Sequence, residues 1–181
     1  MRRFQRGDAR AFPELVRRHR GAVFAFVLRW TQDRARAEDI LQETWLKVVR
    51  ASVDWSPRAR FTTWLYTIAR NACVDGARRA RAHAAAPLDD DRLAADGGDP
   101  ERAAASAELR PVLESAIAAL PDAQREVFLL REMAGIPFHE IARMTGAPEP
   151  TVKSRMRYAL EALRTRLTEA GVDAKAGGQV A

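Results

Sequence analysis

Apolar side chains recur every three or four residues along most of this chain, and no stretch between glycine or proline turns alternates apolar with polar residues. The first spacing places side chains on one face of an α-helix, whereas the second would place them on one face of a β-strand. The helical pattern begins at Phe12 and Leu15 and continues through Phe26 and Val27. We therefore predict an all-α fold.

Two further helices are predicted within residues 1–83, which we take as the first of two small helical domains. Asp33 precedes the stretch ARAEDILQETWLKVVRA in the position of an N-cap, and Glu38 and Asp39 follow where the positive helix end favours acids. Residues 54–60 are predicted to form a loop. A long helix over residues 61–82 comes next, and its predicted buried side carries Phe61, Trp64, Leu65, Ile68 and Ala72.

Residues 84–105 differ from the rest of the chain, since they are rich in Ala, Asp, Gly and Pro and contain almost nothing large and apolar. Such a segment cannot offset its ordering entropy by burial. Six acids and two bases give residues 84–103 a net charge of −4 within a chain of net charge +6, so the remainder carries +10. We predict a flexible acidic linker over residues 84–105.

Residues 106–168 are predicted to form the second helical domain, followed by a disordered tail over residues 169–181. Pro121 suits the start of a helix and Gly135 suits its end. A short helix from Phe138, a turn at Gly146 and a long basic helix follow. This order is the helix-turn-helix pattern.

The last helix is amphipathic, with an apolar stripe, an opposite polar face and two cations on the flanks. The predicted buried stripe is Val152, Met156, Ala159, Leu160, Leu163 and Leu167; the opposite face is Ser154, Arg157, Tyr158 and Glu161; Lys153 and Arg155 flank it. A solvated basic surface is the ordinary interpretation of such a helix, and binding to nucleic acid is the functional one.

Charge favours a nucleic-acid partner, because 30 Lys and Arg residues outnumber 24 Asp and Glu residues and most of the cations are arginine. Arginine binds phosphate and guanine edges with two parallel hydrogen bonds. The lone Cys73 excludes an internal disulfide. No signal peptide and no run of ~18 apolar residues is found, so we expect a soluble cytoplasmic protein without membrane insertion.

No catalytic or metal-binding motif is found, and we expect neither enzymatic activity nor a cofactor. The sequence HEIAR resembles the start of the zinc-peptidase motif HExxH, but Arg143 stands where the second histidine would be. Three histidines in 181 residues also make a structural zinc site improbable.

The helix that follows Asp33 has a second, outward stripe of Asp39, Gln42, Glu43 and Leu46, beside the predicted buried stripe of Ala37, Leu41, Trp45 and Val48. A leucine among acids and an amide is typical of a polar-rimmed protein interface. A single apolar residue is also common on any protein surface, so both interpretations stand.

The helix over residues 61–82 is predicted to present hydroxyls, a ring and arginines on the side away from the core. These residues are Thr63, Tyr66, Thr67 and Arg70, with Asn71, Arg78 and Arg81 around them and the basic loop SPRAR beside them. Such a strip suits single-stranded nucleic acid, whose bases stack on rings while cations follow the backbone. A solvated basic helix is the alternative.

Taken in order, five stretches of the chain resemble the extracytoplasmic-function, or group IV, sigma factors of bacterial RNA polymerase. They are GDARAFPELVRRHRGAVFAFV, AEDILQETWLKVV, FTTWLYTIARNACVDGARR, LPDAQREVFLLREMAGIPFHEIARMTG and TVKSRMRYALEALR, and the resemblance spans about residues 7–167. It implies a helical domain called region two, a helix-turn-helix domain called region four, and a subunit that directs promoter-specific initiation.

The resemblance also assigns roles to residues. Asp39, Gln42, Glu43 and Leu46 would dock on the clamp helices of the largest subunit of core RNA polymerase. The loop over residues 52–60 and the next helix would capture a flipped base of the −10 element. Its implied contacts are Arg58, Arg60, Thr62, Thr63, Tyr66, Arg70 and Asn71, with Arg78, Arg79 and Arg81 near phosphates.

Region four would place the last helix in the major groove of the −35 element. Lys153, Ser154, Arg157 and Tyr158 would read bases, while Thr151 and Arg155 would hold phosphates. The stretch APEPT departs from the family, which often has Ser and Gly before the Thr. Two prolines at this point bear on how the helix starts and on which element it reads.

The family also implies control by an anti-sigma protein. Two other functions remain open at the level of sequence: a free-standing helix-turn-helix regulator that binds an operator without polymerase, and an amphipathic protein of membrane surfaces. No ligand pocket or receiver-like α/β pattern in the first domain supports the regulator. The apolar stripes have each other to pack on, which disfavours the membrane surface.

Overall fold

The structure, a computed structural model, describes residues 1–56, 60–83 and 100–172, with side chains for 1–56, 60–80 and 109–172. These ranges contain helices and turns and no strand. The elements are α1 (Arg2–Gln5), α2 (Ala11–Thr31), α3 (Arg34–Arg50), α4 (Phe61–His83), α5 (Pro100–Ala118), α6 (Asp122–Phe128), the π-helical turn η1 (Leu129–Met133), α7 (Phe138–Thr145) and α8 (Glu149–Glu169). The predicted all-α class is confirmed.

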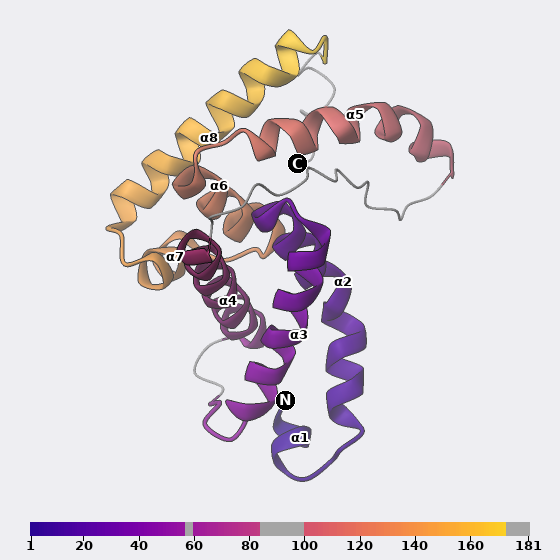
Figure 1. The fold of residues 1–181 in the computed structure, drawn as a ribbon, viewed down its shortest axis with the longest axis vertical. Helices are drawn as coiled ribbons and strands as arrows, with labels where there is room; N and C mark the ends of the chain where they lie inside the picture. The colour runs from indigo at the N-terminus through magenta and orange to yellow at the C-terminus, as the bar shows by residue number, and fades with distance from the viewer. Residues whose placement is uncertain (57–59, 84–99, 173–181) are drawn as a thin grey trace. The chain divides into compact units, whose positions relative to one another are not determined.

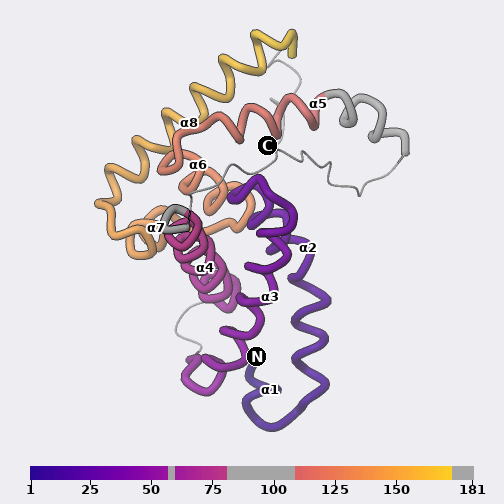
Figure 2. The backbone as a smooth tube through the Cα atoms, viewed as in Figure 1, coloured from indigo at the N-terminus to yellow at the C-terminus, as the bar shows by residue number. Residues whose placement is uncertain are grey.

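The chain divides into two compact units, one containing α1 to α4 and the other containing α5 to α8. In the first unit α2, α3 and α4 pack against one another and α1 packs on α2. Figure 2 shows that α2 and α3 run side by side in opposite directions. The core of this unit is fully enclosed at Phe26, Val27, Val48 and Leu65.

The start of α3 follows from its capping residue. Asp33 has an extended backbone, and its Oδ1 accepts a hydrogen bond from the Arg36 backbone N–H at 3.0 Å. Gln32 just before it adopts a left-handed conformation with φ 58° and ends α2. The predicted N-cap is confirmed, and it fixes where α3 turns back along α2.

His19 of α2 is expected to make the stability of the first unit depend on pH. Its ring lies 5.4 Å from the Phe61 ring, and burial, then Arg18 and the N-terminal ammonium, lower its pKa below the ordinary 6.5. The unfolded chain therefore binds a proton more readily, and the free energy of unfolding should decrease as pH falls through the ordinary pKa towards the folded one. Urea unfolding at about pH 8 and about pH 5.5 measures this. His19→Phe should flatten the difference, and an unchanged difference in that variant would assign it to other groups.

In the second unit α8 packs on α5, α6 and α7, as Figure 1 shows. Its core includes Val127, Leu129, Leu130, Ile141 and Val152, all with no exposed surface. The sequence predicted one continuous helix up to Gly135, whereas α6 ends at Phe128 and continues as the wider π-helical turn η1. The wider turn accompanies the complete burial of two consecutive leucines.

Helix α5 begins at Pro100, so residues 100–105, which were predicted as the end of the linker, lie in a helix. Proline is favoured in the first turn of a helix, and the alanine-rich stretch after it has high helix propensity. The lack of large apolar residues, on which the linker prediction was based, did not reveal this helix. The rest of the predicted linker, residues 84–99, and residues 173–181 of the predicted tail lie outside the described residues.

Candidate protein and nucleic-acid interfaces

The outward face of α3 carries a stripe of acids and apolar residues. Asp39 and Gln42 are exposed, Glu43 is half-buried and Leu46 is 57% exposed. The stripe extends further than predicted, to Val49 one turn on and to Val53, which is 82% exposed, in the turn after the helix. The three-residue spacing of Val49 from Leu46 was a signal that the sequence prediction missed, whereas Val53 lies beyond the end of α3 and no helical spacing places it. These six residues form what we call the α3 stripe.

One acid of the α3 stripe is already ion-paired within the unit. The Glu43 carboxylate lies 2.8 Å from Lys47 Nζ and 2.7 Å from Arg79 Nη2 of α4. Lys47, and then Arg79, hold the pKa of Glu43 below its ordinary value. Lys47 also approaches Asp75 of α4 at 3.5 Å. Glu43 and Arg79, predicted to serve different partners, are therefore in direct contact.

The predicted exposure of Thr63 and Tyr66 on α4 is wrong. Tyr66 is 4% exposed, with its ring edge-on to Phe26 at 5.2 Å between centroids, and Thr63 is also buried. Burial raises the pKa of the Tyr66 hydroxyl. A ring held inside the core cannot stack on an unpaired base.

The cause of this difference is that α4 packs on two helices. A helix against a single neighbour buries one stripe, but α4 contacts both α2 and α3, so its buried arc is wider. Tyr66 lies beside Leu65 in the arc that α2 covers. Sequence periodicity gives the direction of each side chain and leaves open how many neighbours cover it.

The other residues predicted for −10 DNA retain an accessible surface where they are described. Arg60, Asn71, Arg78 and Arg79 are exposed, and Thr62, Thr67 and Arg70 are half-buried. Arg70 Nη1 donates to the Asn71 side-chain oxygen at 3.3 Å. Arg58 and the side chain of Arg81 lie outside the described residues. Among the described residues that were predicted to contact −10 DNA, the accessible ones therefore form a basic strip that contains no aromatic ring.

The start of α8 accommodates both prolines of the APEPT stretch. Gly146 ends α7 in a left-handed conformation with φ 69°, and Pro148 occupies the N-cap position of α8. Pro150 then falls in the first turn, where backbone N–H groups have no partner within the helix. The Val152 N–H donates to the Pro148 carbonyl at 3.0 Å, so regular helix begins here.

Arg157 and Tyr158 form an exposed pair on α8. The guanidinium carbon of Arg157 lies 4.9 Å from the centre of the Tyr158 ring, and Arg157 Nη2 donates to the tyrosine hydroxyl at 3.2 Å. Tyr158 is 47% exposed and Arg157 is exposed as well. The pair leaves arginine donors and an aromatic face available to a partner.

The remaining predicted residues of α8 are less free. Lys153 is exposed but pairs with Glu149 one turn earlier at 2.6 Å, and this pairing lowers the pKa of Glu149. The Ser154 hydroxyl donates to the Pro150 carbonyl at 3.0 Å. Thr151, Ser154 and Arg155 are half-buried. Lys153 keeps two further N–H donors for a base, and the Ser154 hydroxyl can still accept a hydrogen bond.

The prediction that Leu160 lies in the buried stripe of α8 is wrong, because this side chain is 49% exposed. The buried residues of α8 are Val152, Met156, Ala159 and Leu163. At 100° per residue Leu160 lies about 70° from the centre of that set, on the side of Arg157. The buried face of α8 is therefore narrower than the apolar stripe in the sequence.

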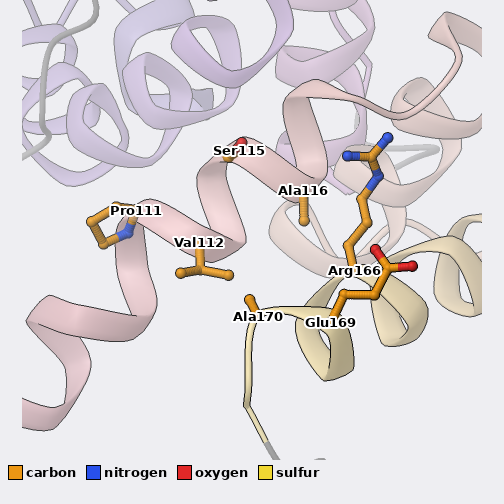
Figure 3. Close-up of a pocket in the computed structure, with 7 residues that line it drawn as sticks. All are labelled: Pro111, Val112, Ser115, Ala116, Arg166, Glu169 and Ala170. Carbon is orange, nitrogen blue, oxygen red and sulfur yellow. The ribbon is translucent and has the colours of Figure 1, made fainter.

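A shallow open groove of about 460 Å³ lies between α5 and α8, as Figure 3 shows. Small side chains such as Val112 and Ala116 line its α5 side, and Arg166 and Glu169 line its α8 side. The groove is near the C-terminal end of α8, more than two turns beyond the Arg157–Tyr158 pair. It is separate from the exposed pair.

Among the described residues, no group of three His, Cys, Asp or Glu side chains could hold a metal ion. Glu140 and Arg143 of the HEIAR stretch pair with each other in α7. No helix of the described part is both long and apolar enough to cross a membrane.

Two family models match the two units. Sigma-70 region 2 matches residues 15–83, and Sigma-70, region 4 matches residues 111–163. The first match covers α3, α4 and most of α2, and the second covers the helix-turn-helix of α7 with most of α8. Each exposed surface described above thus lies mainly within one of the two matched regions.

The chain is also similar along nearly its whole length to characterised relatives. It is 34% identical over 170 residues to the RNA polymerase sigma-H factor of Pseudomonas aeruginosa, with 89% of this chain and 88% of that protein covered. It is 34% identical over 169 residues to the RNA polymerase sigma factor CarQ of Myxococcus xanthus, with 93% and 96% covered. It is 35% identical over 153 residues to the ECF RNA polymerase sigma factor SigM of Mycobacterium tuberculosis, with 84% and 75% covered.

Solved structures agree with these relatives. CnrH in complex with the cytosolic domain of CnrY aligns at a TM-score of 0.65 and 26% identity, over 91% of this chain and 92% of CnrH. The sigma factor RpoE in complex with the anti-sigma factor NepR from Bartonella quintana aligns at a TM-score of 0.70 and 22% identity, over 88% and 98%, and shows the shared fold. The chain therefore belongs to the sigma-70 family of RNA polymerase sigma factors, in its extracytoplasmic-function group.

Proposed function

We propose that this chain is an alternative sigma factor that binds core RNA polymerase in the cytoplasm and directs initiation at its own promoters. The observation that carries the proposal is that one chain holds two separate exposed surfaces, the α3 stripe and the Arg157–Tyr158 face, each within a matched sigma region. The protein supplies binding and positioning, and the chemistry of RNA synthesis belongs to the polymerase. No enzymatic role is proposed for it.

The α3 stripe is the proposed contact with the clamp helices of the largest polymerase subunit. Leu46 supplies an exposed apolar centre, and Asp39 and Gln42 supply a polar rim. Val49 on α3 and Val53 in the turn after it add two more exposed apolar side chains. This composition supports a protein partner better than solvation, because covering three exposed apolar side chains with a partner removes them from water and lowers the free energy of the complex.

The basic strip of α4 is the proposed surface for opened −10 DNA. Arg60 and Asn71 are proposed to bind an extruded base, and Arg78 and Arg79 to hold phosphates, which their exposed side chains support. Thr62, Arg70 and the predicted contacts Arg58 and Arg81 complete the set. Tyr66 and Thr63 are not part of it, since the core encloses them. Because Tyr66 is enclosed, charge and hydrogen bonding rather than stacking on this ring would hold the strand.

The N-terminal half of α8 is the proposed reader of the −35 element. An α-helix fits the major groove, where arginine recognises guanine through two hydrogen bonds. Arg157, Tyr158 and Lys153 are the exposed residues among the predicted readers, whereas Ser154 is half-buried. Thr151 and Arg155 are proposed to hold backbone phosphates.

An anti-sigma protein is the proposed regulator. The structural relative CnrH, 26% identical, is bound to the cytosolic domain of another protein, CnrY. A regulator of this chain would have to cover the α3 stripe or the DNA-facing helices in order to prevent initiation.

Transcription with purified core polymerase tests the proposed function. Sequencing of transcripts after overexpression of the protein would first define start sites and their −10 and −35 sequences. The full chain with core polymerase should then give run-off transcripts from those promoters, while core alone gives none. Promoter-specific transcription that stays at background after the protein is added would end the proposal. Tight operator protection by the isolated protein, at nanomolar concentration, would favour the free-standing regulator instead.

Arg157→Ala should weaken recognition of the −35 element by about 1–3 kcal/mol if a bidentate contact to a base is lost. The holoenzyme's affinity should be compared on a matched −35 duplex and on duplexes with single substitutions. A loss confined to the matched sequence assigns Arg157 to a base. An equal loss on every duplex would instead assign it to phosphate. Arg164→Ala, an exposed arginine two turns further along α8, serves as the control.

A further inference from the structure

The short helix α1 contacts the turn after α3, where the 52–60 segment begins that is proposed to capture a base of the −10 element. Gln5, at its last residue, donates from Nε2 to the Ser52 carbonyl at 2.8 Å and to the Trp55 carbonyl at 2.7 Å. Both acceptors lie about fifty residues away in the sequence, in the described first half of the 52–60 segment. One amide group therefore connects the beginning of the chain to the turn after α3. Gln5 precedes the family match, which starts at residue 15.

The segment that carries Gln5 is itself anchored to the first unit. The Phe4 ring lies 5.2 Å from the Phe12 ring of α2, which meets Trp45 of α3 edge-on at 6.0 Å. Arg3 pairs with Asp8 at 2.7 Å across the bend between α1 and α2. Gly7 adopts φ +91° in this bend, a conformation that favours glycine. These contacts anchor the backbone of α1, and with it Gln5, to α2 and α3.

The turn held by Gln5 is joined to both proposed interfaces of the unit. The Ser52 hydroxyl donates to the Val49 carbonyl of the α3 stripe at 2.6 Å. The Trp55 ring lies 6.3 Å from Phe61 and 6.4 Å from Trp64 in the first turn of α4. Trp55 therefore links this turn directly to the first turn of α4, which follows Arg60.

We propose that Gln5 is a positioning residue for −10 recognition, acting through the Ser52 and Trp55 carbonyls rather than by touching DNA. The inference rests on the proposed function of the 52–60 segment and adds a residue outside the matched sigma region. Its chemistry is specific: the side chain must donate two hydrogen bonds to two carbonyl acceptors. A glutamate at this position has the same shape but no N–H donor, so the turn should be released. A lysine is longer and carries N–H donors, so it should still hold the turn in place.

Gln5→Glu should therefore lower the affinity for the matched −10 strand on the order of tenfold, because two hydrogen bonds are lost and the turn populates its binding position less. A strand with the captured base replaced should bind almost as before. Gln5→Lys restores donors and should retain most of the wild-type discrimination between the two strands. In Gln5→Glu, binding to core polymerase should fall much less than −10 discrimination, because Val53 is the only residue of the α3 stripe that lies in the released turn. In Gln5→Lys, binding to core polymerase and the thermal midpoint should both stay close to wild type.

The test uses holoenzyme assembled from core polymerase and the full chain, with fluorescent single strands that carry the mapped −10 sequence or the replaced base. A reduced ratio of affinities in Gln5→Glu, restored in Gln5→Lys, supports the inference. An unchanged ratio in Gln5→Glu, or a loss in both variants alike, would overturn it. An equal loss of core binding would also overturn it, since the effect would then be general. If the wild-type holoenzyme itself does not discriminate, the proposed function fails as well.

Discussion

Leu46→Asp is expected to weaken binding of the protein to core polymerase by about 30-fold or more. The leucine is 57% exposed at the centre of the α3 stripe, where a partner would bury it completely. Aspartate removes that apolar contact and places a charge in the covered centre, and a central residue of this kind typically contributes about 2 kcal/mol or more. Titration of core polymerase with a fluorescently labelled chain would measure the change.

The matched control for this variant is Val74→Asp. Val74 is also an exposed apolar residue of the first unit, on α4 and outside the α3 stripe. The Val74→Asp variant should bind core polymerase with the same affinity as the wild type. Equal weakening in both variants would mean that a charge anywhere on this unit is harmful, and unchanged binding in Leu46→Asp would remove the α3 stripe from the interface. Val53→Asp should fall between the two, because Val53 lies at the end of the stripe.

Tyr66→Ala should destabilise the first unit by about 3–5 kcal/mol, a large share of the stability of a small domain. The ring fills the space between α4 and Phe26 of α2, so its removal leaves a cavity that three packed helices cannot easily close. Urea unfolding followed by tryptophan fluorescence would report the loss, because all four tryptophans lie in this unit.

Tyr66→Phe separates packing from DNA contact. Phenylalanine keeps the ring and removes only the hydroxyl, so stability and affinity for the −10 strand should both stay close to wild type. The base-stacking role predicted from the sequence would return if Tyr66→Ala stayed folded and lost only DNA affinity. Asn71→Ala, an exposed change on the same helix, should show the reverse pattern: weaker binding of DNA with unfolding unaltered.

Local signals in the sequence were enough to predict most helices and several of their ends. Asp33 as N-cap, Gly135 and Gly146 as helix stops, and proline tolerated at the start of α8 all depend on a few neighbouring residues, and each is found where it was expected. The outward orientation of Leu46 and Arg157 also follows from periodicity, because each lies far from the centre of its apolar stripe. The sequence by itself therefore determined the fold class and the direction in which most side chains point.

Only the tertiary structure decided how much of each face is covered. Tyr66 is buried because α4 packs on two helices, Leu160 is exposed because the buried face of α8 is narrow, and Glu43 meets Arg79 because α3 lies along α4. The hydrogen bonds from Gln5 join residues about fifty positions apart, a separation at which no local pattern operates. The physical reason is that helical periodicity is a property of one segment, whereas burial and pairing depend on which other segments surround it.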